Sequence, residues 1–357
     1  MTMKTFKVGS YQIGTEFPTF IIAEAGANWR ISRDMNKNYK HALRLIDIAV
    51  KARADAVKFQ LYRADRLYAK NAGTADYIGK KKSIYDIIQE MELPYSWLRK
   101  LKLYCDKKGI MFTCTPFDIQ SLNELIKIKM PVYKIASYSV TQYPLLKEVA
   151  KTRKPIFMST GATNLQLIDK AVTLLRQNGN SKLALLQCTA KYPAPLTSLN
   201  LRVIPLLQKR YHVPIGLSDH SREPHIGPLG AVALGGRIIE KHFTTDNSLS
   251  GPDQGFAILG RELIDLVSNI RKMEAALGEG KKYVTTDEDE LHKFTEYRIF
   301  ATKNIPAGSP LKGAIDVLRS GKVTTGLFAD RWQWALKQRA KKQILIHTPI
   351  TQNLLTT

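Results

Sequence analysis

The segment Pro214–Thr244, PIGLSDHSREPHIGPLGAVALGGRIIEKHFT, contains one complete unit of the pattern on which the fold depends. An apolar run at Pro214–His220 is followed by the helix-like stretch Pro224–Leu234 and by a second apolar run at Arg237–Thr244. Neither run alternates between apolar and polar residues, which is typical of strands that are covered on both faces. The segment therefore predicts a strand, a helix and a second, parallel strand.

The same pattern recurs along the chain, with about eight strand-like runs in all. The other runs are Phe20–Gly26, Ala56–Gln60, Met111–Pro116, Val132–Ser137, Pro155–Gly161 and Leu183–Thr189. The other helical stretches are Asn38–Ala54, Ser96–Lys108, Asp118–Lys129, Tyr143–Arg153, Leu165–Gln177, Asn200–Tyr211 and Arg261–Leu277. This order and length predict an α/β fold of the (β/α)8, or TIM-barrel, type. A doubly wound open sheet is the alternative, but no GxGxxG follows the first strand.

The remainder of the chain has a different character. An acidic stretch, TTDEDELHKF at Thr285–Phe294, precedes short strand-like pieces that proline and glycine interrupt. Such pieces are typical of a small β-rich domain. We therefore expect a barrel domain at 1–284 and a β-rich domain at 285–357.

Composition limits the classes of protein to consider. Of 357 residues, 54 are Lys or Arg and 31 are Asp or Glu, which gives a net charge of +23, and 44% are hydrophobic. That apolar content suits a globular core and excludes a disordered basic tail. No apolar run approaches the length of a membrane span, the first residues lack a secretory apolar segment, and three cysteines form no CxxC motif. We expect a cytoplasmic protein without membrane contact.

Polar side chains mark the ends of the predicted strands. They are Glu24, Lys58, Gln60, Thr115, Lys134, Ser137, Ser159, Tyr192, Ser218, His220 and His242. In a parallel barrel, the carboxyl ends of the strands and the loops after them build the active site. Lys58 and Lys134 lie within apolar strands, where an ammonium group needs an anionic partner or a shifted pKa. One such lysine suits a Schiff-base nucleophile, and two with hydroxyls suit a phosphate or carboxylate cradle; ordinary buried salt bridges are the alternative.

Two histidines, His220 and His242, end adjacent predicted strands. Imidazoles from neighbouring strands, with a carboxylate or water, suit a divalent metal of the Mn, Mg or Zn type. Two hydrogen-bonded core histidines are the alternative. The turn Gly251-Pro252-Asp253 would return Asp253 to the same site, or would be a plain loop. Buried cysteines are more often core residues than nucleophiles, so we assign none of the three to chemistry.

Several short motifs occur in a fixed order along the chain. They are AE-x-G-x-N at Ala23–Asn28, VK-x-Q at Val57–Gln60, TPF at Thr115–Phe117, YKI-x-S at Tyr133–Ser137, STG at Ser159–Gly161, CT-x-x-YP at Cys188–Pro193, GLSDH at Gly216–His220, GAVALGG-x-IIEKHFT at Gly230–Thr244 and GPD at Gly251–Asp253. This ordered set resembles the sialic acid synthase (N-acetylneuraminate synthase) family. The segment N-IPAG-x-x-L at Asn304–Leu311 resembles the family's C-terminal antifreeze-like (SAF) domain.

The resemblance implies a transferase that condenses phosphoenolpyruvate with an N-acylated hexosamine, such as N-acetylmannosamine or a related 2,4-diacetamido sugar. The products would be a nine-carbon 2-keto sugar acid and phosphate, with cleavage of the C–O bond. It also implies a divalent metal, Mn2+ or Mg2+, on His220 and His242. A domain-swapped homodimer is implied too, in which Arg319 of the SAF domain reaches the partner's site.

By the same resemblance, one group of residues holds phosphoenolpyruvate: Lys58, Thr115, Lys134, Ser137, Ser159 and Ser218. A second group faces the sugar: Glu24, Gln60, Tyr192 and Asp253. Glu24 would position or protonate the reacting oxygens. With Lys58 and Lys134, we also expect Lys241 and Arg319 to bring positive charge to the site.

The chain departs from the family pattern at Trp29, Ser139 and Ala190. We expect these positions near the sugar, which predicts an altered acceptor or an inactive paralogue. Two other functions stay open on the residues alone. A metal-dependent barrel aldolase or lyase would use the histidines without phosphoenolpyruvate. A nucleic-acid-binding protein would explain the +23 charge, but the basic clusters are scattered along the chain, and we do not expect nucleic acid as a partner.

Overall fold

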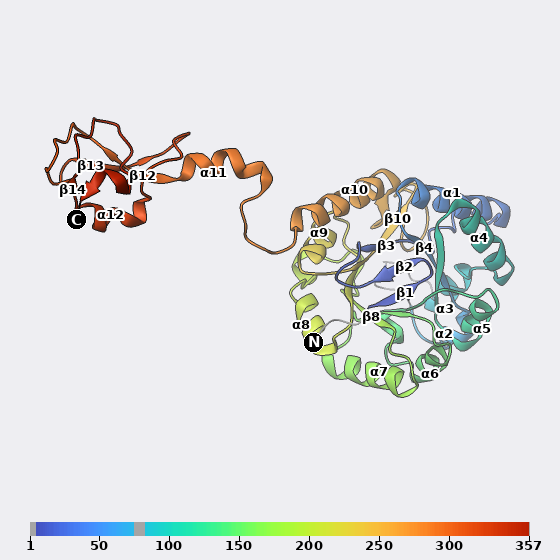
Figure 1. Cartoon of the computed structure of the whole chain (residues 1–357). Coiled ribbons are helices and arrows are strands. Elements are labelled where there is room, and N and C mark those ends of the chain that lie inside the picture. Colours follow the sequence, from blue (N-terminus) through green and yellow to red (C-terminus); the bar gives the residue numbers. More distant parts are fainter. Residues whose placement is uncertain (1–4, 75–82, 357) are drawn as a thin grey trace. The chain divides into compact units, whose positions relative to one another are not determined.

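A computed structural model describes residues 5–74 and 83–356 of the chain. It contains two compact units, Met1–Gly278 and Glu279–Thr357 (Figure 1). The division falls a few residues before the expected boundary at 284/285. Each unit has its own hydrophobic core.

The first unit is a parallel barrel. Its strands are β3 Phe20–Gly26, β4 Ala56–Leu61, β5 Met111–Pro116, β6 Tyr133–Ile135, β7 Ile156–Ser159, β8 Leu183–Cys188, β9 Ile215–Asp219 and β10 Ile238–Thr244. They are ordered β5-β4-β3-β10-β9-β8-β7-β6, with β5 next to β6, so the sheet is nearly closed. A two-residue strand, β11 Ile258–Leu259, adds to β10. The predicted barrel class is confirmed.

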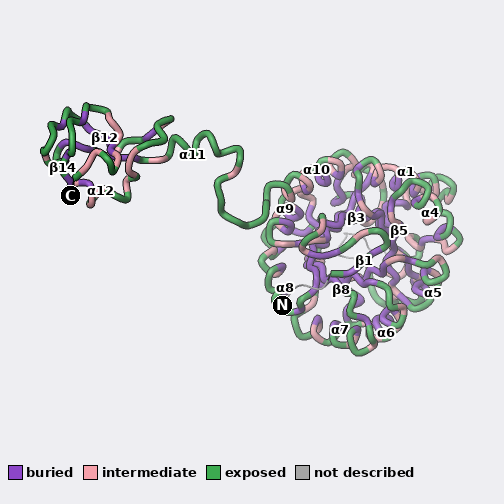
Figure 2. The backbone as a smooth tube through the Cα atoms, in the orientation of Figure 1, coloured by how far each residue is buried: buried purple, intermediate pink, exposed green. Residues whose placement is uncertain are grey.

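Helices surround the strands. They are α1 Met35–Lys51, α4 Tyr95–Lys108, α5 Ile119–Lys127, α6 Tyr143–Lys151, α7 Leu165–Gln177, α8 Val203–Tyr211, α9 Ile226–Ala233 and α10 Gly260–Leu277. Local chemistry fixes several starts: Asp34 accepts from two backbone N–H groups of α1, and Asp118 accepts from the N–H of Ser121 in α5. Each helix buries an apolar stripe against the strands and exposes its outer face (Figure 2).

The amino end of the barrel is closed by a hairpin that the sequence patterns did not predict. Strands β1 Phe6–Val8 and β2 Tyr11–Ile13 pair antiparallel. Phe6, Val8 and Ile13 pack into a cluster with Phe20 and Phe157 of the barrel interior. Three-residue strands are too short to show a reliable period. The hairpin thus covers the amino end of the barrel interior, opposite the carboxyl ends of the strands.

Two further short helices, α2 Ala64–Leu67 and α3 Ile84–Glu90, lie between β4 and α4. The sequence patterns did not predict them either, since neither is long enough to show helical periodicity.

The predicted strand Val132–Ser137 is shorter than expected. It ends at Ile135 and gives way to a 3-10 turn at Ser137–Ser139.

The second unit is small and contains short strands, as predicted. Strands β12 Tyr297–Ala301 and β13 Ile315–Arg319 pair antiparallel, as do β14 Arg339–Ala340 and β15 Leu355–Thr356. Helices α11 Asp289–Thr295 and α12 Trp332–Ala335 complete it. Its core includes Ile299, Ile305 and Leu311. Throughout residues 5–74 and 83–356, no helix has the length and apolarity that a membrane crossing requires.

Candidate active site

A cavity of about 750 Å3 opens at the carboxyl ends of the barrel strands. It is lined by the twelve barrel residues that the sequence assigned to binding or catalysis: Glu24, Lys58, Gln60, Thr115, Lys134, Ser137, Ser159, Tyr192, Ser218, His220, His242 and Asp253. These residues come from distant parts of the chain, and barrel closure brings their strand ends to one point.

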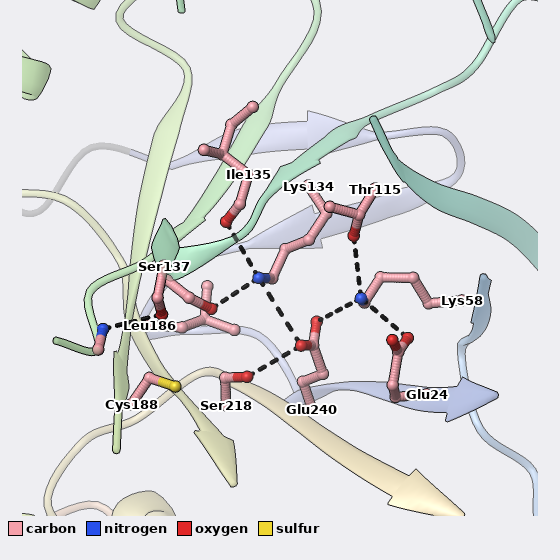
Figure 3. Close-up of polar contacts among 12 residues, drawn as sticks. Glu24, Lys58, Thr115, Lys134, Ile135, Ser137, Leu186, Cys188, Ser218 and Glu240 are labelled. Carbon is pink, nitrogen blue, oxygen red and sulfur yellow. Dashed lines mark hydrogen bonds and ion pairs between the residues drawn. The ribbon is translucent and has the colours of Figure 1, made fainter. Parts of the chain in front are cut away.

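Lys58 is held by three neighbours. Its Nζ lies 2.8 Å from Glu24 Oε2, and it donates to Thr115 Oγ1 at 3.0 Å (Figure 3). Glu240 Oε2 lies 3.7 Å from the same nitrogen. Strand pairing explains the first contact, because Lys58 is level with Glu24 on β3. Thr115 is level with Gln60, two residues further along β4, and the long Lys58 side chain reaches it from there.

Lys134 has a similar environment on the other side of Glu240. Its Nζ donates to Ser159 Oγ at 2.6 Å and lies 3.7 Å from Glu240 Oε1. Ser218 donates to that carboxylate oxygen at 2.9 Å. Two buried ammonium groups therefore flank one buried carboxylate, with hydroxyls beside them (Figure 3). The alternative of buried salt bridges describes these pairs, but both ammonium groups also line the cavity.

Glu240 was not assigned a role from the sequence. It precedes His242 by two residues on β10, and side chains two apart in a strand face the same side. That spacing was the available signal, because it places the carboxylate in the cavity with the histidine. Together with Glu24, the Glu240 carboxylate balances the positive charges of Lys58 and Lys134.

Burial shifts the ionisation of these groups. It raises the pKa of the Glu24 carboxyl to about 7, although Lys58 opposes the shift. Burial alone would lower the pKa of Lys58, but Glu24 and Glu240 raise it above its ordinary value. The pKa of Lys134 is lowered by burial, with Glu240 opposing. A carboxyl with a pKa near neutrality can exchange a proton with a bound substrate.

Glu24 is also held from the other side. Gln60 Nε2 donates to its Oε1 at 2.8 Å. Asp253 lies close by, since the backbone N–H of Ala27 donates to its Oδ2 at 3.4 Å. A Cβ atom on Gly26, which has φ +50°, would lie 2.8 Å from the same oxygen. Glycine at this position therefore allows Asp253 to return to the site.

The two histidines approach one another from β9 and β10. Their ring centroids are 5.5 Å apart, and the Tyr192 ring stacks on His220 at 4.2 Å. His220 Nδ1 lies 2.8 Å from the carbonyl oxygen of Thr189 and donates to it, which leaves a lone pair at Nε2. Burial, with the positive charge of His220 and Lys58, holds the pKa of His242 well below its ordinary range.

The two imidazoles, when both are neutral, offer a divalent cation two nitrogen ligands. His242 Nδ1 is buried without a hydrogen-bond partner, and it lies 3.7 Å from Asp253 Oδ2. Within the described ranges, no three side chains of His, Cys, Asp or Glu converge as a complete ligand set. The protein would therefore supply His220 and His242, and other positions would be left for substrate or water.

Cys188 lies in this cavity, although the sequence assigned no cysteine to chemistry. Its sulfur is 3.7 Å from His220 Nδ1. Burial raises the pKa of the Cys188 thiol, but His220 lowers it further, so that the pKa lies below its ordinary value.

Ser137 lies in the 3-10 turn after β6. Its hydroxyl oxygen accepts a hydrogen bond from the backbone N–H of Gly161 at 2.9 Å.

Lys241, another basic residue expected at the site, does not line this cavity. Lys241 faces away from it, between the sheet and the outer layer, where its Nζ lies 2.6 Å from Asp219 Oδ2. It occupies the opposite side of β10 from Glu240 and His242, since alternate side chains point in opposite directions. Arg319 belongs to the second unit, where it is exposed and its Nε donates to the Tyr297 hydroxyl at 3.1 Å.

The three departures from the family pattern do not all face the cavity. Ala190 lines it. Trp29 instead packs outside the strands, edge to face with Trp97 of α4. Ser139 is buried in the turn after β6 and is not part of the lining. The expectation that all three lie beside the sugar is thus wrong for Trp29 and Ser139.

A parallel barrel with a charged cavity at the carboxyl ends of its strands is the arrangement of (β/α)8-barrel enzymes. Comparison with known proteins identifies the family. The NeuB family model matches residues 45–282, and the chain belongs to the NeuB family.

Named relatives agree with this assignment. The chain is 39% identical to the spore coat polysaccharide biosynthesis protein SpsE of Bacillus subtilis, over 91% of this chain and 90% of that protein. It is 35% identical to the N,N'-diacetyllegionaminic acid synthase of Campylobacter jejuni, over 91% and 96%. The crystal structure of the N-acetylneuraminic acid (sialic acid) synthetase from Leptospira borgpetersenii, in complex with citrate, matches with a TM-score of 0.72 at 34% identity, over 82% and 96%. The chain is an enzyme of this acid-synthase kind.

Proposed function

We propose that the enzyme condenses phosphoenolpyruvate with an N-acylated hexosamine. The products would be a nine-carbon 2-keto sugar acid and inorganic phosphate. The observation that carries this proposal is the pair of buried ammonium groups, Lys58 and Lys134, which line one cavity together with the hydroxyls of Thr115, Ser159 and Ser218. Phosphoenolpyruvate carries a phosphate and a carboxylate, and such a cradle suits both anions.

The two lysines would hold the anionic ends of this substrate, and the serine and threonine hydroxyls would donate to its oxygens. Ser137 would join them from the turn after β6. Charge balance supports this arrangement: Lys58 and Lys134 are matched by Glu24 and Glu240 in the free protein. A protonated Glu24 would free Lys58 from one of its two carboxylate partners, so that its charge could pair with the substrate.

In the reaction, C3 of phosphoenolpyruvate forms a bond to the aldehyde carbon of the sugar. The former aldehyde oxygen takes up a proton, for which Glu24 is the candidate donor. Water then adds to the electron-poor C2 and loses a proton, and the resulting tetrahedral centre releases phosphate by cleavage of the C2–O bond. A well-placed proton donor accelerates such steps by about 10²- to 10⁴-fold.

His220 and His242 would hold the divalent cation, Mn2+ or Mg2+. When bound, it supplies Lewis-acid polarisation of the aldehyde. Gln60 and Asp253 flank Glu24 and would orient the sugar beside it. Tyr192, stacked on His220, would form the wall of the sugar subsite.

We also propose that the second unit, residues 285–357 with its linker, is a SAF domain that covers the barrel of a second copy in a homodimer. Arg319 is exposed on β13, which agrees with a role toward a partner. The molecular mass in solution tests the dimer. Loss of activity in Arg319→Ala at an unchanged molecular mass tests the proposed role of Arg319 in the partner's site.

The three cysteines are unpaired, which agrees with a cytoplasmic location.

The direct test is phosphate release from phosphoenolpyruvate with Mn2+ and a panel of N-acylated hexosamines. We expect release that depends on the sugar and that chelation abolishes. Double replacement of Lys58 and Lys134 by Met should remove it, whereas the exposed control Lys151→Met should not. Turnover of a sugar substrate by the double variant without phosphoenolpyruvate would instead identify a metal-dependent aldolase or lyase.

A further inference from the structure

Lys241 immediately precedes His242 on β10, but its side chain points away from the cavity. The residue is 1% exposed. Its Nζ donates to Asp219 Oδ2 at 2.6 Å, to the backbone oxygen of Ser221 at 2.6 Å and to that of Glu223 at 2.8 Å. These bonds use all three N–H groups of the ammonium. We call these four residues the β9–β10 clamp.

The clamp holds the residues on both sides of His220. Asp219 ends β9 directly before this histidine, and Ser221 directly follows it. Asp219 also binds Ser221: its Oδ1 accepts from the backbone N–H of Ser221 at 2.8 Å, and its Oδ2 accepts from the Ser221 hydroxyl at 3.1 Å. His220 therefore lies between two residues that are bonded to each other and to Lys241.

Backbone pairing stops just before the two histidines. The ladder between β9 and β10 ends with the pair Asp219 and Lys241. His220 and His242 each follow a member of this last pair, so the ladder itself does not hold them together. The ammonium group of Lys241 continues the connection between the two strands beyond the end of the ladder.

Other bonds of His220 lead to a different part of the barrel. Its backbone oxygen accepts from the N–H of Ala194 at 3.0 Å, and its Nδ1 lies 2.8 Å from the oxygen of Thr189. Both partners belong to the segment after β8, whereas His242 belongs to β10. The distance between the two imidazoles therefore depends on the connection between β9 and β10, and the clamp supplies that connection.

We infer that the β9–β10 clamp fixes the separation of His220 and His242 for a divalent cation, so that Lys241 is a positioning residue. This inference rests on the proposed function, which assigns the cation to these two histidines. A cation needs both imidazole nitrogens at about 2.2 Å or less. A loop that is ordered before binding loses little conformational freedom when the cation binds, so the affinity is higher.

The experiment measures the Kd for Mn2+ of the full chain by electron paramagnetic resonance of the free ion. Lys241→Met keeps the length of the side chain and removes all three donated bonds. We expect its Kd to rise about three- to tenfold, which is less than in His220→Ala, because the clamp acts through the histidine and not on the cation.

Ser221→Ala is a milder variant of the same clamp. It removes the hydroxyl that donates to Asp219 and keeps the ammonium group of Lys241. We expect the Kd for Mn2+ to rise about two- to threefold, the equivalent of part of one hydrogen bond. Urea unfolding establishes that each variant is folded under the conditions of the binding measurement.

Arg271→Met is the matched control for loss of stability. Arg271 lies on α10, where its guanidinium contacts the carboxylates of Asp55 and Glu274. Asp55 directly precedes β4, so this cluster lies at the amino end of the barrel, opposite the histidines. The variant should lower the free energy of unfolding and leave the Kd for Mn2+ unchanged.

Steady-state kinetics separate positioning from substrate binding. Because the clamp faces away from the cavity, the KM for phosphoenolpyruvate of Lys241→Met at saturating Mn2+ should equal that of wild type. Excess Mn2+ should also restore the kcat of this variant. A purely structural role of Lys241 would change neither the Kd for Mn2+ nor the Mn2+ concentration that activity requires.

An unchanged Kd in both clamp variants would overturn the inference, and so would an equal rise in Arg271→Met. If Lys241→Met does not fold, Ser221→Ala decides alone. These results would leave the proposed function standing, because the wild-type enzyme would still bind Mn2+ through its histidines. If neither His220→Ala nor His242→Ala changed the Kd, the proposed cation site would be wrong, and the inference with it.

Discussion

The carboxylate of Glu24 and the ammonium group of Lys58 lie 2.8 Å apart, and both side chains are almost completely buried. Strand register brings them together, because these residues are level on the neighbouring strands β3 and β4. A buried pair of this kind gives little net stability, since desolvation offsets the attraction. Its position in the cavity makes it available for a substrate, and the following predictions rest on it and on its neighbours.

Replacing Lys58 or Lys134 by Met should weaken phosphoenolpyruvate binding. Each change removes one charge-assisted set of hydrogen bonds to the substrate, and we expect the KM for phosphoenolpyruvate to rise about 10- to 100-fold. Steady-state phosphate release at varied phosphoenolpyruvate measures this. The KM for the sugar should change less. An unchanged KM for phosphoenolpyruvate in both variants would contradict the proposed cradle.

Glu24 should make stability depend on pH. Burial raises its pKa from 4.5 in the unfolded chain to about 7 in the folded protein. Between these values the folded protein retains a proton that the unfolded chain has lost, so the contribution of Glu24 to the free energy of unfolding falls as pH rises through this window. Glutamine does not ionise, so Glu24→Gln lacks this pH-dependent contribution. The free energy of unfolding of the variant, relative to that of wild type, should therefore increase from pH 4.5 to 7.

Urea unfolding at several pH values measures this difference. Glu148→Gln, at a surface pair with Lys151, is the matched control and should follow the wild-type curve. Parallel curves for Glu24→Gln and wild type would show that Glu24 ionises normally in the folded protein.

His220→Ala and His242→Ala should each weaken binding of Mn2+, by roughly tenfold or more. The reason is that each change removes one of the two imidazoles that the cavity offers to a cation. Electron paramagnetic resonance of free Mn2+ measures binding without reference to activity. His292→Ala, at an exposed position of α11, should bind Mn2+ as the wild type does. Equal affinity in all three variants would place the cation elsewhere.

Lys241→Met should destabilise the barrel rather than impair substrate binding. Lys241 is buried and lies 2.6 Å from Asp219, so its loss leaves the carboxylate buried without its partner. Breaking such a pair costs about 3–5 kcal/mol. Urea unfolding measures the loss, and Lys151→Met should stay within about 0.5 kcal/mol of wild type. A stable Lys241→Met with a raised KM for phosphoenolpyruvate would return Lys241 to the active site.

The sequence alone determined the barrel and most of its site. The strands and helices of the βα units carry strong periodic patterns, so strands such as Phe20–Gly26 and Met111–Pro116 are found with the predicted bounds. Because parallel barrel strands all end at one rim, polar strand ends such as Lys58 and His220 can be assigned to one cavity from the sequence.

Tertiary structure decided what local patterns do not encode. The contacts of β10 with neighbouring strands placed Glu240 between the two lysines and Lys241 against Asp219. Short elements without a period, the hairpin β1–β2 and the helices α2 and α3, closed the amino end and supplied apolar residues to the cavity lining. Their positions depend on contacts between residues distant in the chain, and such contacts leave no periodic signal in the segments that make them.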